Sequence, residues 1–310
     1  NFIKLLPMKP KPPVTISFFI ILFFTLDETV SIPFIISYNQ LCMSISRQNL
    51  TVVIVTLKSQ HIIDQCIQSI DSDISILIVE NSNNEYFKSY VENKYKNVSC
   101  ILSKDNIGMG AGNNLGIDNT KSDFVLILNP DVILSKDTIE KLINASNDLS
   151  NFAIMSPISQ DINYPNYFIK NKKDVDHKNI FEVESLDGYC MLMNKKRINS
   201  IFKKEKIFDE KFFMYLENND LCKRIKDNNE KIFVLPTCTI KHFGAKAVSE
   251  NFVKEVELSR NWHWTWSKFY FSKKHKSYYY ALLEGLPKFV TSMVKCLFYY
   301  VVFKKYKSKI

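Results

Sequence analysis

Four short runs of consecutive apolar residues, each followed by a segment with helical spacing, constrain the fold of this chain more than any other feature. The runs cover residues 50–56, 74–80, 98–102 and 123–128, and the helical segments between them cover residues 61–70, 85–95 and 110–120. Strands that are apolar along their whole length are buried on both faces, and the helices between them supply parallel crossovers. We therefore predict an α/β fold: a Rossmann-like, mostly parallel central sheet flanked by helices.

The remaining elements follow a less regular pattern. We expect a helix with Ser135 as its N-cap, a short strand over 152–155, a polar loop over 161–184, a strand over 185–194 entered by a turn at Asp187-Gly188, a helix from Glu217, and a strand over 231–236 that the segment 239–242 follows. Ligands of open α/β sheets bind beyond the carboxyl ends of the strands. The polar residues at those ends, Thr56, Glu80, Asn81, Asn129 and Asp131, are therefore candidate ligand contacts.

Positive charge is concentrated in the C-terminal tail. Eleven lysines or arginines and one acid, Glu284, lie between Arg260 and Ile310, so this segment carries the whole +9 net charge of the chain. Residues 286–303 are apolar but interrupted by Lys288 and Lys295, which favours an interfacial membrane helix over a spanning one; a solvated helix is the alternative. We predict that residues 259–310 form a helical, basic and aromatic extension on a membrane surface. The near-neutral remainder disfavours nucleic-acid binding.

The first 42 residues have a different character from the predicted domain at 43–258. Residues 14–26 form an apolar run of 13 residues, too short to span a bilayer, after three lysines. Met43 stands just before the first strand, so we interpret residues 1–42 as upstream sequence; a membrane-associated leader or a signal peptide are the alternatives. The seven cysteines include no CxxC pair, which argues against a disulfide framework or a zinc site and fits a cytoplasmic protein.

An acidic constellation stands out in the second half of the chain. Glu217 and Asp220 lie together at a predicted helix start, Asp131 follows a strand, and His242 ends a late strand. Each residue also has a purely structural interpretation. The helix acids can be a capping turn, Asp131 can form an Asx turn, and His242 can be a packed side chain.

Six motifs in a fixed order carry a resemblance that favours function. They are TLKS from Thr56, VENS from Val79, NIGMGAGNNLG from Asn106, LNPD from Leu128, FDEKFFMYLENNDLCKR from Phe208, and KH at Lys241. Together they resemble the family 2 glycosyltransferases, and within them the rhamnosyltransferase-like branch. The resemblance implies a GT-A fold, an inverting mechanism and a donor sugar activated as a nucleotide diphosphate.

The resemblance also assigns a nucleotide site. Thr56 and the Glu80-Asn81-Ser82 turn would receive the nucleobase and ribose, with Glu80 where the family usually has Asp. The run from Asn106 through Gly108, Gly110 and Asn114 would pass the nucleotide and diphosphate, where glycine permits close approach. A dinucleotide-binding turn is the alternative for these glycines, but their spacing is not GxGxxG. Asn129-Pro130-Asp131 stands in place of the family's DxD motif.

The metal, the base and the acceptor contacts follow in the same way. Asp131 is the first expected ligand of Mn²⁺ or Mg²⁺, and His242 is the second. Glu217 or Asp220 would be the catalytic base, because Asn218, where many relatives have Asp, cannot accept a proton. Arg224 is expected to pair with Asp220 across one helical turn and hold it in place, which favours Glu217 as the base. The Asp187-Gly188 turn resembles one that faces the acceptor.

The predicted function is therefore transfer of a hexose, rhamnose or a similar sugar, from a dTDP- or UDP-linked donor. The acceptor would be a glycan or polyprenyl-linked glycan of a surface polysaccharide, met at the inner face of the cytoplasmic membrane. A catalytically inactive nucleotide-sugar-binding or scaffold protein is the alternative, and the amides Asn129 and Asn218 support it.

Overall fold

The structure is a computed structural model that describes residues 44–149, 151–161, 163–171, 175–203, 205–244 and 253–302. The expectations for residues 1–42 and for the lysines from Lys304 onward lie outside these ranges. The described residues all belong to one unit of the chain, Ser44–Ile310.

One curled sheet organises the described residues. Its strands are β1 (Leu50–Thr56), β2 (Ser75–Glu80), β3 (Val98–Leu102), β4 (Phe124–Leu128), β5 (Val132–Leu134), β6 (Phe152–Ser159), β8 (Phe181–Glu182), β10 (Cys190–Asn194) and β11 (Lys231–His242). They follow the order β3-β2-β1-β4-β10-β6-β11-β5, with β8 on β11, and β3, β2, β1, β4, β6 and β11 point the same way. A separate pair joins β7 (Tyr167–Phe168) to β9 (Ser185–Leu186).

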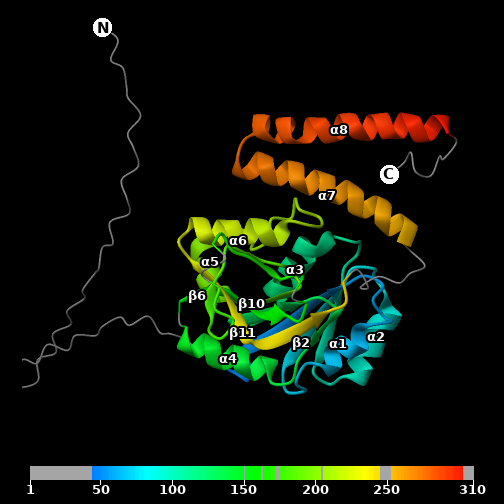
Figure 1. Ribbon diagram of the computed structural model, residues 1–310. Coiled ribbons are helices and arrows are strands. Elements are labelled where there is room, and N and C mark those ends of the chain that lie inside the picture. Colours follow the sequence, from blue (N-terminus) through cyan, green and yellow to red (C-terminus); the bar gives the residue numbers. More distant parts are fainter. Residues whose placement is uncertain are drawn as a thin grey trace, which may run out of the picture. The chain divides into compact units, whose positions relative to one another are not determined.

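Helices cover both faces of this sheet (Figure 1). One face carries α1 (Ile63–Gln68), α2 (Glu85–Lys94) and α4 (Thr138–Asp148), and the other carries α3 (Gly108–Asn119), α5 (Lys195–Phe202) and α6 (Glu217–Asp227). Successive residues of β1 explain this division, because Val52 and Ile54 enter the first core while Val53 enters the second. The fully apolar strands are therefore buried on both faces, as predicted, and the α/β prediction is confirmed.

Several predicted boundaries differ from the observed ones. The predicted helix at Ser135 begins at Thr138, because Ser135 Oγ instead donates to Thr239 O at 2.6 Å and Asp137 adopts a left-handed φ of 63°. The strand predicted over 152–155 extends to Ser159. The predicted loop over 161–184 contains β7 and β8, and the strand predicted over 231–236 is the first part of β11, which continues to His242 with an irregularity after Leu235.

Strand β10 runs antiparallel between β4 and β6. Because its direction is opposite, it begins at the edge where β1, β2 and β4 end. The Asp187-Gly188 turn, which precedes β10, is therefore carried to the same edge as the strand-end residues, although it lies far from them in the sequence.

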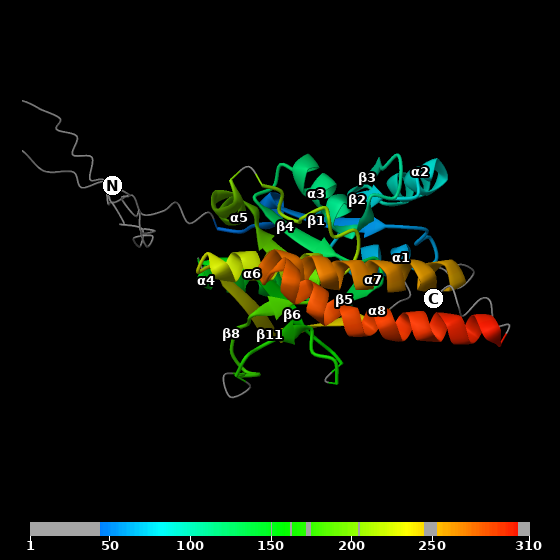
Figure 2. The same cartoon turned by 90° about the horizontal axis from the view of Figure 1, so that it is seen from above.

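The C-terminal tail forms two long helices, α7 (Val253–His275) and α8 (Tyr278–Val301). Ser277 Oγ caps α8 by accepting from Tyr280 N at 3.1 Å, and Ser272 Oγ of α7 donates to Glu284 Oε2 of α8 at 2.5 Å. Figure 2 shows the two helices alongside each other, and Figure 1 shows α7 between α8 and the rest of the described fold. The helical nature of the predicted extension is thus observed.

Candidate active site

The carboxyl ends of β1 and β2 form a hydrogen-bonded polar group. Thr56 Oγ1 donates to Glu80 Oε2, and Glu80 Oε1 accepts from the backbone N and the hydroxyl of Ser82, the former at 2.9 Å. Glu80 is completely buried, so its longer side chain is held by protein groups on both oxygens. A cavity of about 730 Å³ opens beside this group, between the loop after β1 and the start of α2. Its lining includes Lys58, His61, Ser82 and Tyr86.

Helix α3 lies directly against these strands, and its glycines make the close contact possible. A Cβ on Gly112 would lie 2.8 Å from Val55 Cγ1, and one on Gly116 would lie 2.4 Å from Val53 Cγ1. Gly108, at φ +84°, would place a Cβ 2.3 Å from Phe213 O. Asn81 Nδ2 adds a hydrogen bond to Gly108 O at 3.1 Å. The glycines are therefore required for packing of protein on protein, whereas contact of Gly108 and Gly110 with a nucleotide stays a prediction.

The two asparagines predicted beside these glycines have structural partners. Asn114 Nδ2 donates to Phe208 O at 2.8 Å and its Oδ1 accepts from Phe208 N at 3.0 Å. Asn106 Oδ1 accepts from Gly108 N at 3.1 Å, which orders the start of α3. Since both polar atoms of the buried Asn114 are engaged, we interpret it as the residue that attaches the loop at Phe208 to α3.

A second polar group lies where β4 ends and β11 ends beside β5. Asp131 Oδ1 and His242 Nε2 are 3.3 Å apart, and Phe243 N donates to Asp131 O at 3.0 Å. Tyr189 stacks on the His242 ring with centroids 4.1 Å apart, which fixes the orientation of the imidazole. Asn129 N donates to Tyr189 O at 2.9 Å. The predicted metal pair of Asp131 and His242 is therefore brought together.

This pair fits a divalent cation. Asp131 is buried at 2% exposure, and its Oδ1 accepts no hydrogen bond of good geometry among the described residues, the contact with His242 Nε2 at 3.3 Å included. A buried carboxylate oxygen without a partner is costly, and an imidazole beside it suits Mn²⁺. The described residues contain no group of three or more His, Cys, Asp or Glu that could hold a metal. The remaining ligands would have to come from outside the described residues, and donor phosphates could supply them.

A third group surrounds Glu217, the first residue of α6. Tyr215 and Leu216, immediately before it, both have left-handed φ angles, 72° and 64°, which cost about 1–2 kcal/mol each for residues with a side chain. Glu217 Oε2 is buried and has no hydrogen-bond partner among the described residues. Burial raises the pKa of Glu217 to about 7. A carboxyl with these properties is suited to accept a proton near neutral pH.

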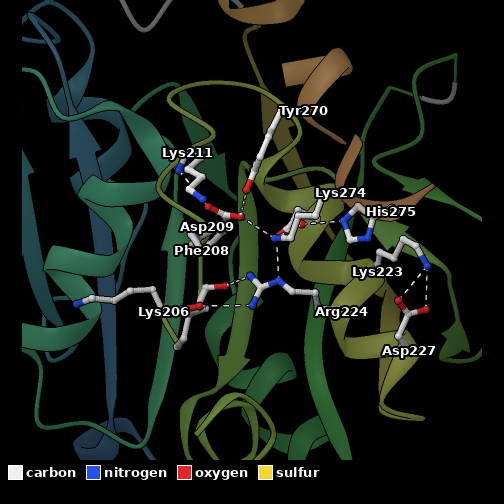
Figure 3. Close-up of polar contacts among 12 residues, drawn as sticks. Lys206, Phe208, Asp209, Lys211, Lys223, Arg224, Asp227, Tyr270, Lys274 and His275 are labelled. Atoms are coloured by element: carbon white, nitrogen blue, oxygen red, sulfur yellow. Dashed lines mark hydrogen bonds and ion pairs between the residues drawn. The ribbon is translucent and has the colours of Figure 1, made fainter. Parts of the chain in front are cut away.

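Asp220 has a different environment from Glu217. Its carboxylate, completely buried, accepts from Arg224 Nε at 2.8 Å and lies 2.7 Å from Lys274 Nζ and 2.8 Å from His275 Nε2. Burial would raise the pKa of Asp220, but the hydrogen bonds from His275 and Lys274 outweigh it and lower that pKa. Figure 3 shows Lys274 and His275 reaching from α7 to this region. The predicted ion pair with Arg224 is confirmed, and we interpret Asp220 as an anchoring carboxylate.

The Asp187-Gly188 turn lies against the first turn of α6. Asn218 Nδ2 donates to Leu186 O at 2.7 Å, and a Cβ on Gly188 would lie 3.2 Å from Asn218 Cβ. Asp187 is exposed, yet the surrounding protein desolvates its carboxyl and raises its pKa, an effect that the nearby His242 opposes. The turn therefore connects the Glu217 group with the Asp131–His242 group.

Most of the predicted site residues gather around α3 and the strand ends. Buried side-chain atoms without a hydrogen-bond partner, counted over the residues that the structure describes, occur in Asn81, Asn113, Asn129, Asp131, Thr138 and Glu217. Four of these six residues were predicted from the sequence, and unpaired buried groups of this kind mark places where a ligand can bind. Sequence reasoning missed Tyr189, Lys274 and His275. Extending the strand-end rule into the loop after β1 would have found Lys58 and His61.

Comparison with known proteins gives three similarities. Hexosyltransferase Agl10 of low-salt glycan biosynthesis in Haloferax volcanii is 25% identical over 204 residues, covering 59% of this chain and 64% of that protein. The chain thus spans just under two thirds of this relative. The structure of GalNAc-T7 with UDP, GalNAc and Mn²⁺ has a TM-score of 0.54 at 11% identity, covering 74% of this chain and 52% of that one. That of S. aureus TarS has a TM-score of 0.47 at 17% identity, covering 68% and 38%.

The structural similarity to GalNAc-T7 concerns the fold alone, which is of the GT-A type. A sequence family described as Glycosyl transferase family 2 matches residues 51–220, from β1 to the first turn of α6. Because this match covers more than half of the residues, the chain belongs to glycosyl transferase family 2.

Proposed function

We propose that this chain transfers a hexose from a nucleotide diphosphate sugar to a hydroxyl of a glycan, with inversion at the anomeric carbon. The observation that carries the proposal is Glu217, a half-buried residue whose Oε2 is buried without a hydrogen-bond partner among the described residues and whose pKa is raised to about 7. It begins a helix at the edge of the sheet where family 2 enzymes are expected to bind their donor.

Glu217 performs the proton transfer in this proposal. Its carboxylate accepts the proton of the acceptor hydroxyl while the hydroxyl oxygen attacks the anomeric carbon and the bond from that carbon to the nucleoside diphosphate breaks on the opposite face, so the sugar changes configuration in one displacement. A pKa of about 7 leaves enough carboxylate at neutral pH and keeps it basic enough to take the proton. Asp220 cannot share this task readily, because both of its oxygens are engaged by cations. Asp187, on the turn against α6, would orient the acceptor.

The donor would lie across the strand ends. Ser82 lines the cavity, and together with Thr56 and Glu80, to which it is linked by hydrogen bonds, it would hold the nucleobase and ribose. Asp131 and His242 would hold Mn²⁺ or Mg²⁺ together with diphosphate oxygens, and when bound the cation would offset charge on the leaving diphosphate. A UDP- or dTDP-linked hexose, rhamnose or a similar sugar, is the proposed donor. The hexosyltransferase name of the Haloferax volcanii relative supports the sugar class.

A thermal-shift screen of nucleotide diphosphate sugars with Mn²⁺, Mg²⁺ or EDTA tests the donor assignment. A ligand present at 100 times its Kd stabilises a protein by about 2.7 kcal/mol, which corresponds to a rise in Tm of roughly 5 °C for a domain of this size. We expect such a rise for one nucleotide class, and a smaller rise in EDTA. The absence of any rise with UDP- or dTDP-sugars would contradict the donor proposal.

A second candidate function is that of a catalytically inactive nucleotide-sugar-binding protein. The observation in its favour is that amides, Asn129 and Asn218, stand where many relatives carry acids, and that Asn218 donates to Leu186 O, as an ionised carboxylate could not. Calorimetric binding of a nucleotide sugar without release of nucleoside diphosphate would favour this candidate. Release of nucleoside diphosphate that depends on the cation would exclude the inactive-protein candidate.

We further propose that α8 places the chain on the inner face of the cytoplasmic membrane, where a polyprenyl-linked glycan would be the acceptor. The helix exposes apolar side chains along its length, and Ala281 is its only buried residue among those the structure describes. The exposed residues include Leu283, Leu286, Phe289, Val290, Met293, Val294, Leu297 and Phe298. In the described part of the chain no helix qualifies as a membrane span. Lysines around the apolar surface complement anionic lipid headgroups.

Vesicle flotation tests this placement. The full chain should float with vesicles that contain anionic phospholipid, and added salt should weaken binding because each lysine near the surface contributes about 1 kcal/mol. Replacing Leu283, Leu286 and Phe289 together by Asp should reduce the bound fraction more than tenfold without loss of the fold. Tyr164→Asp, at an exposed site on a loop, is the control. Equal flotation of the triple variant, or self-association of the chain instead of lipid binding, would contradict the proposal.

A further inference from the structure

We propose that α7 is a positioning element of the active site, with Lys274 as its main residue, and not merely a connection to α8. The inference rests on the proposed role of Glu217 as the base. It concerns a part of the chain that begins after the matched family segment, which ends at residue 220. The observations that carry it are contacts between α7 and the segment Phe208–Leu216, which delivers Glu217 to α6.

Contacts run along most of this segment. Ser267 Oγ donates to Met214 O at 2.8 Å, and Trp266 Nε1 donates to Lys211 O at 3.2 Å. Rings of α7 pack on rings of the segment in three pairs. These pairs are His263 on Phe213 at 4.2 Å, Trp264 on Tyr215 at 5.4 Å, and Tyr270 on Phe212 at 4.8 Å between centroids. Successive turns of α7 therefore determine the path of the segment.

Lys274 joins the two ends of the segment. Its Nζ lies 2.7 Å from Asp209 Oδ2 and 2.7 Å from Asp220 Oδ1, so one ammonium links the start of the segment to the first turn of α6 (Figure 3). Tyr270 OH also donates to Asp209 Oδ2, at 2.9 Å. Arg224 completes the link from the other side, because it pairs with Asp220 and donates to Ile207 O.

The strained backbone before Glu217 explains why such support is needed. Tyr215 and Leu216 are both in the left-handed region, which non-glycine residues leave unless their surroundings hold them there. The contacts nearest to them are those of Trp264 with Tyr215 and of Ser267 with the Met214 carbonyl. On the opposite side, Met109 N of α3 donates to Phe213 O at 2.9 Å. The segment is thus held between α3 and α7, and both helices fix the position of Glu217.

The test is a double-mutant cycle in the full chain, measured as release of nucleoside diphosphate. Lys274→Met should lower kcat about 100-fold, the size of effect that a misplacement of about 1 Å can cause, with the KM for the donor changed less than about threefold. Lys274→Arg should recover most of the loss. In the Glu217→Gln background, Lys274→Met should have no further effect, because residues that act as one unit are not additive. Lys273→Met, the neighbouring exposed lysine, is the matched control.

Ser267→Ala provides a second test with little change in side-chain volume. It removes only the hydrogen bond to Met214 O, and we expect kcat to fall about tenfold with unchanged binding of the nucleotide. Equal losses from Lys274→Met in the wild-type and Glu217→Gln backgrounds would overturn the inference, as would kcat values near wild type for Lys274→Met and Ser267→Ala. If Glu217→Gln itself retained full activity, the proposed base would fail instead, and the two failures are thereby distinguishable.

Discussion

Glu217→Gln is expected to lower the rate of sugar transfer by about 10³-fold while donor affinity changes little. A positioned general base contributes about 10² to 10⁴ to a rate, and the amide cannot accept a proton. The substitution keeps the size and shape of a side chain that lies against Gly110 of α3. The measurement is release of nucleoside diphosphate at saturating donor, with donor affinity from calorimetry.

The same variant should be more stable than the wild type at alkaline pH. In the folded protein the pKa of Glu217 is about 7, above its usual value of 4.5, so folding favours the protonated form. The contribution of Glu217 to the free energy of unfolding is fully present below the usual pKa and is lost as the pH rises through about 7. Glutamine avoids this loss. We expect Glu217→Gln to raise the free energy of unfolding by roughly 2 kcal/mol at pH 8, discounted for partial exposure of the residue, and by nothing at pH 4.

Asp227→Asn is the matched control for this pair of effects. Asp227 ends the same helix and pairs with the exposed Lys223 at 2.9 Å, a surface ion pair worth about 0–1 kcal/mol. It should change neither the rate nor the pH dependence of stability. A Glu217→Gln variant that is inactive but differs from the wild type in free energy of unfolding by the same amount at pH 4 and pH 8 would show that Glu217 is not carried in a desolvated, neutralised form.

Asp131→Asn should have the second largest effect, a loss of transfer of about 10³-fold. Asp131 supplies the one buried carboxylate of the proposed cation site. By offsetting the charge on a leaving diphosphate, a bound cation stabilises the transition state by several kcal/mol. The variant should also lose the part of donor affinity that Mn²⁺ adds. In EDTA its donor affinity should equal that of the wild type.

Calorimetry of the donor with Mn²⁺ and with EDTA separates these outcomes. Asp148→Asn, an exposed acid at the end of α4, serves as the control and should keep the response to Mn²⁺. If Asp131→Asn kept the full Mn²⁺-dependent increase in affinity, the cation would have to bind elsewhere, and the assignment of Asp131 and His242 would be wrong.

The sheet was predictable because its first four strands are apolar along their whole length. Residues of β1 alternate between the two cores, so every position must be apolar, and this leaves a clear pattern in the sequence. The order of β10, β6 and β11 could not be predicted. An antiparallel strand such as β10, covered on both faces, has the same apolar pattern as a parallel one. Its placement depends on tertiary packing.

The candidate site was predictable where it lies at strand ends. Thr56, Glu80 and Asp131 follow that rule directly, whereas His242 required the family resemblance. The role of Asp220 was only half predictable. Its pairing with Arg224 follows from helical spacing, but its partner His275 is 55 residues away and belongs to a tail whose docking has no local signal. The spacing to Arg224 favours Glu217 over Asp220 as the base already in the sequence, whereas the contacts of Asp220 with α7 appear only in the folded chain.

The pH dependence of nucleoside diphosphate release tests the central claim most directly. Wild-type chain with the donor found in the thermal-shift screen and Mn²⁺ should show a kcat that rises as Glu217 loses its proton, with an apparent pKa near the folded value of about 7. Glu217→Gln should show a low rate without this rise. A wild-type profile that is flat between pH 5 and 8, or one that Glu217→Gln reproduces, would contradict the assignment of Glu217 as the base of an inverting sugar transfer.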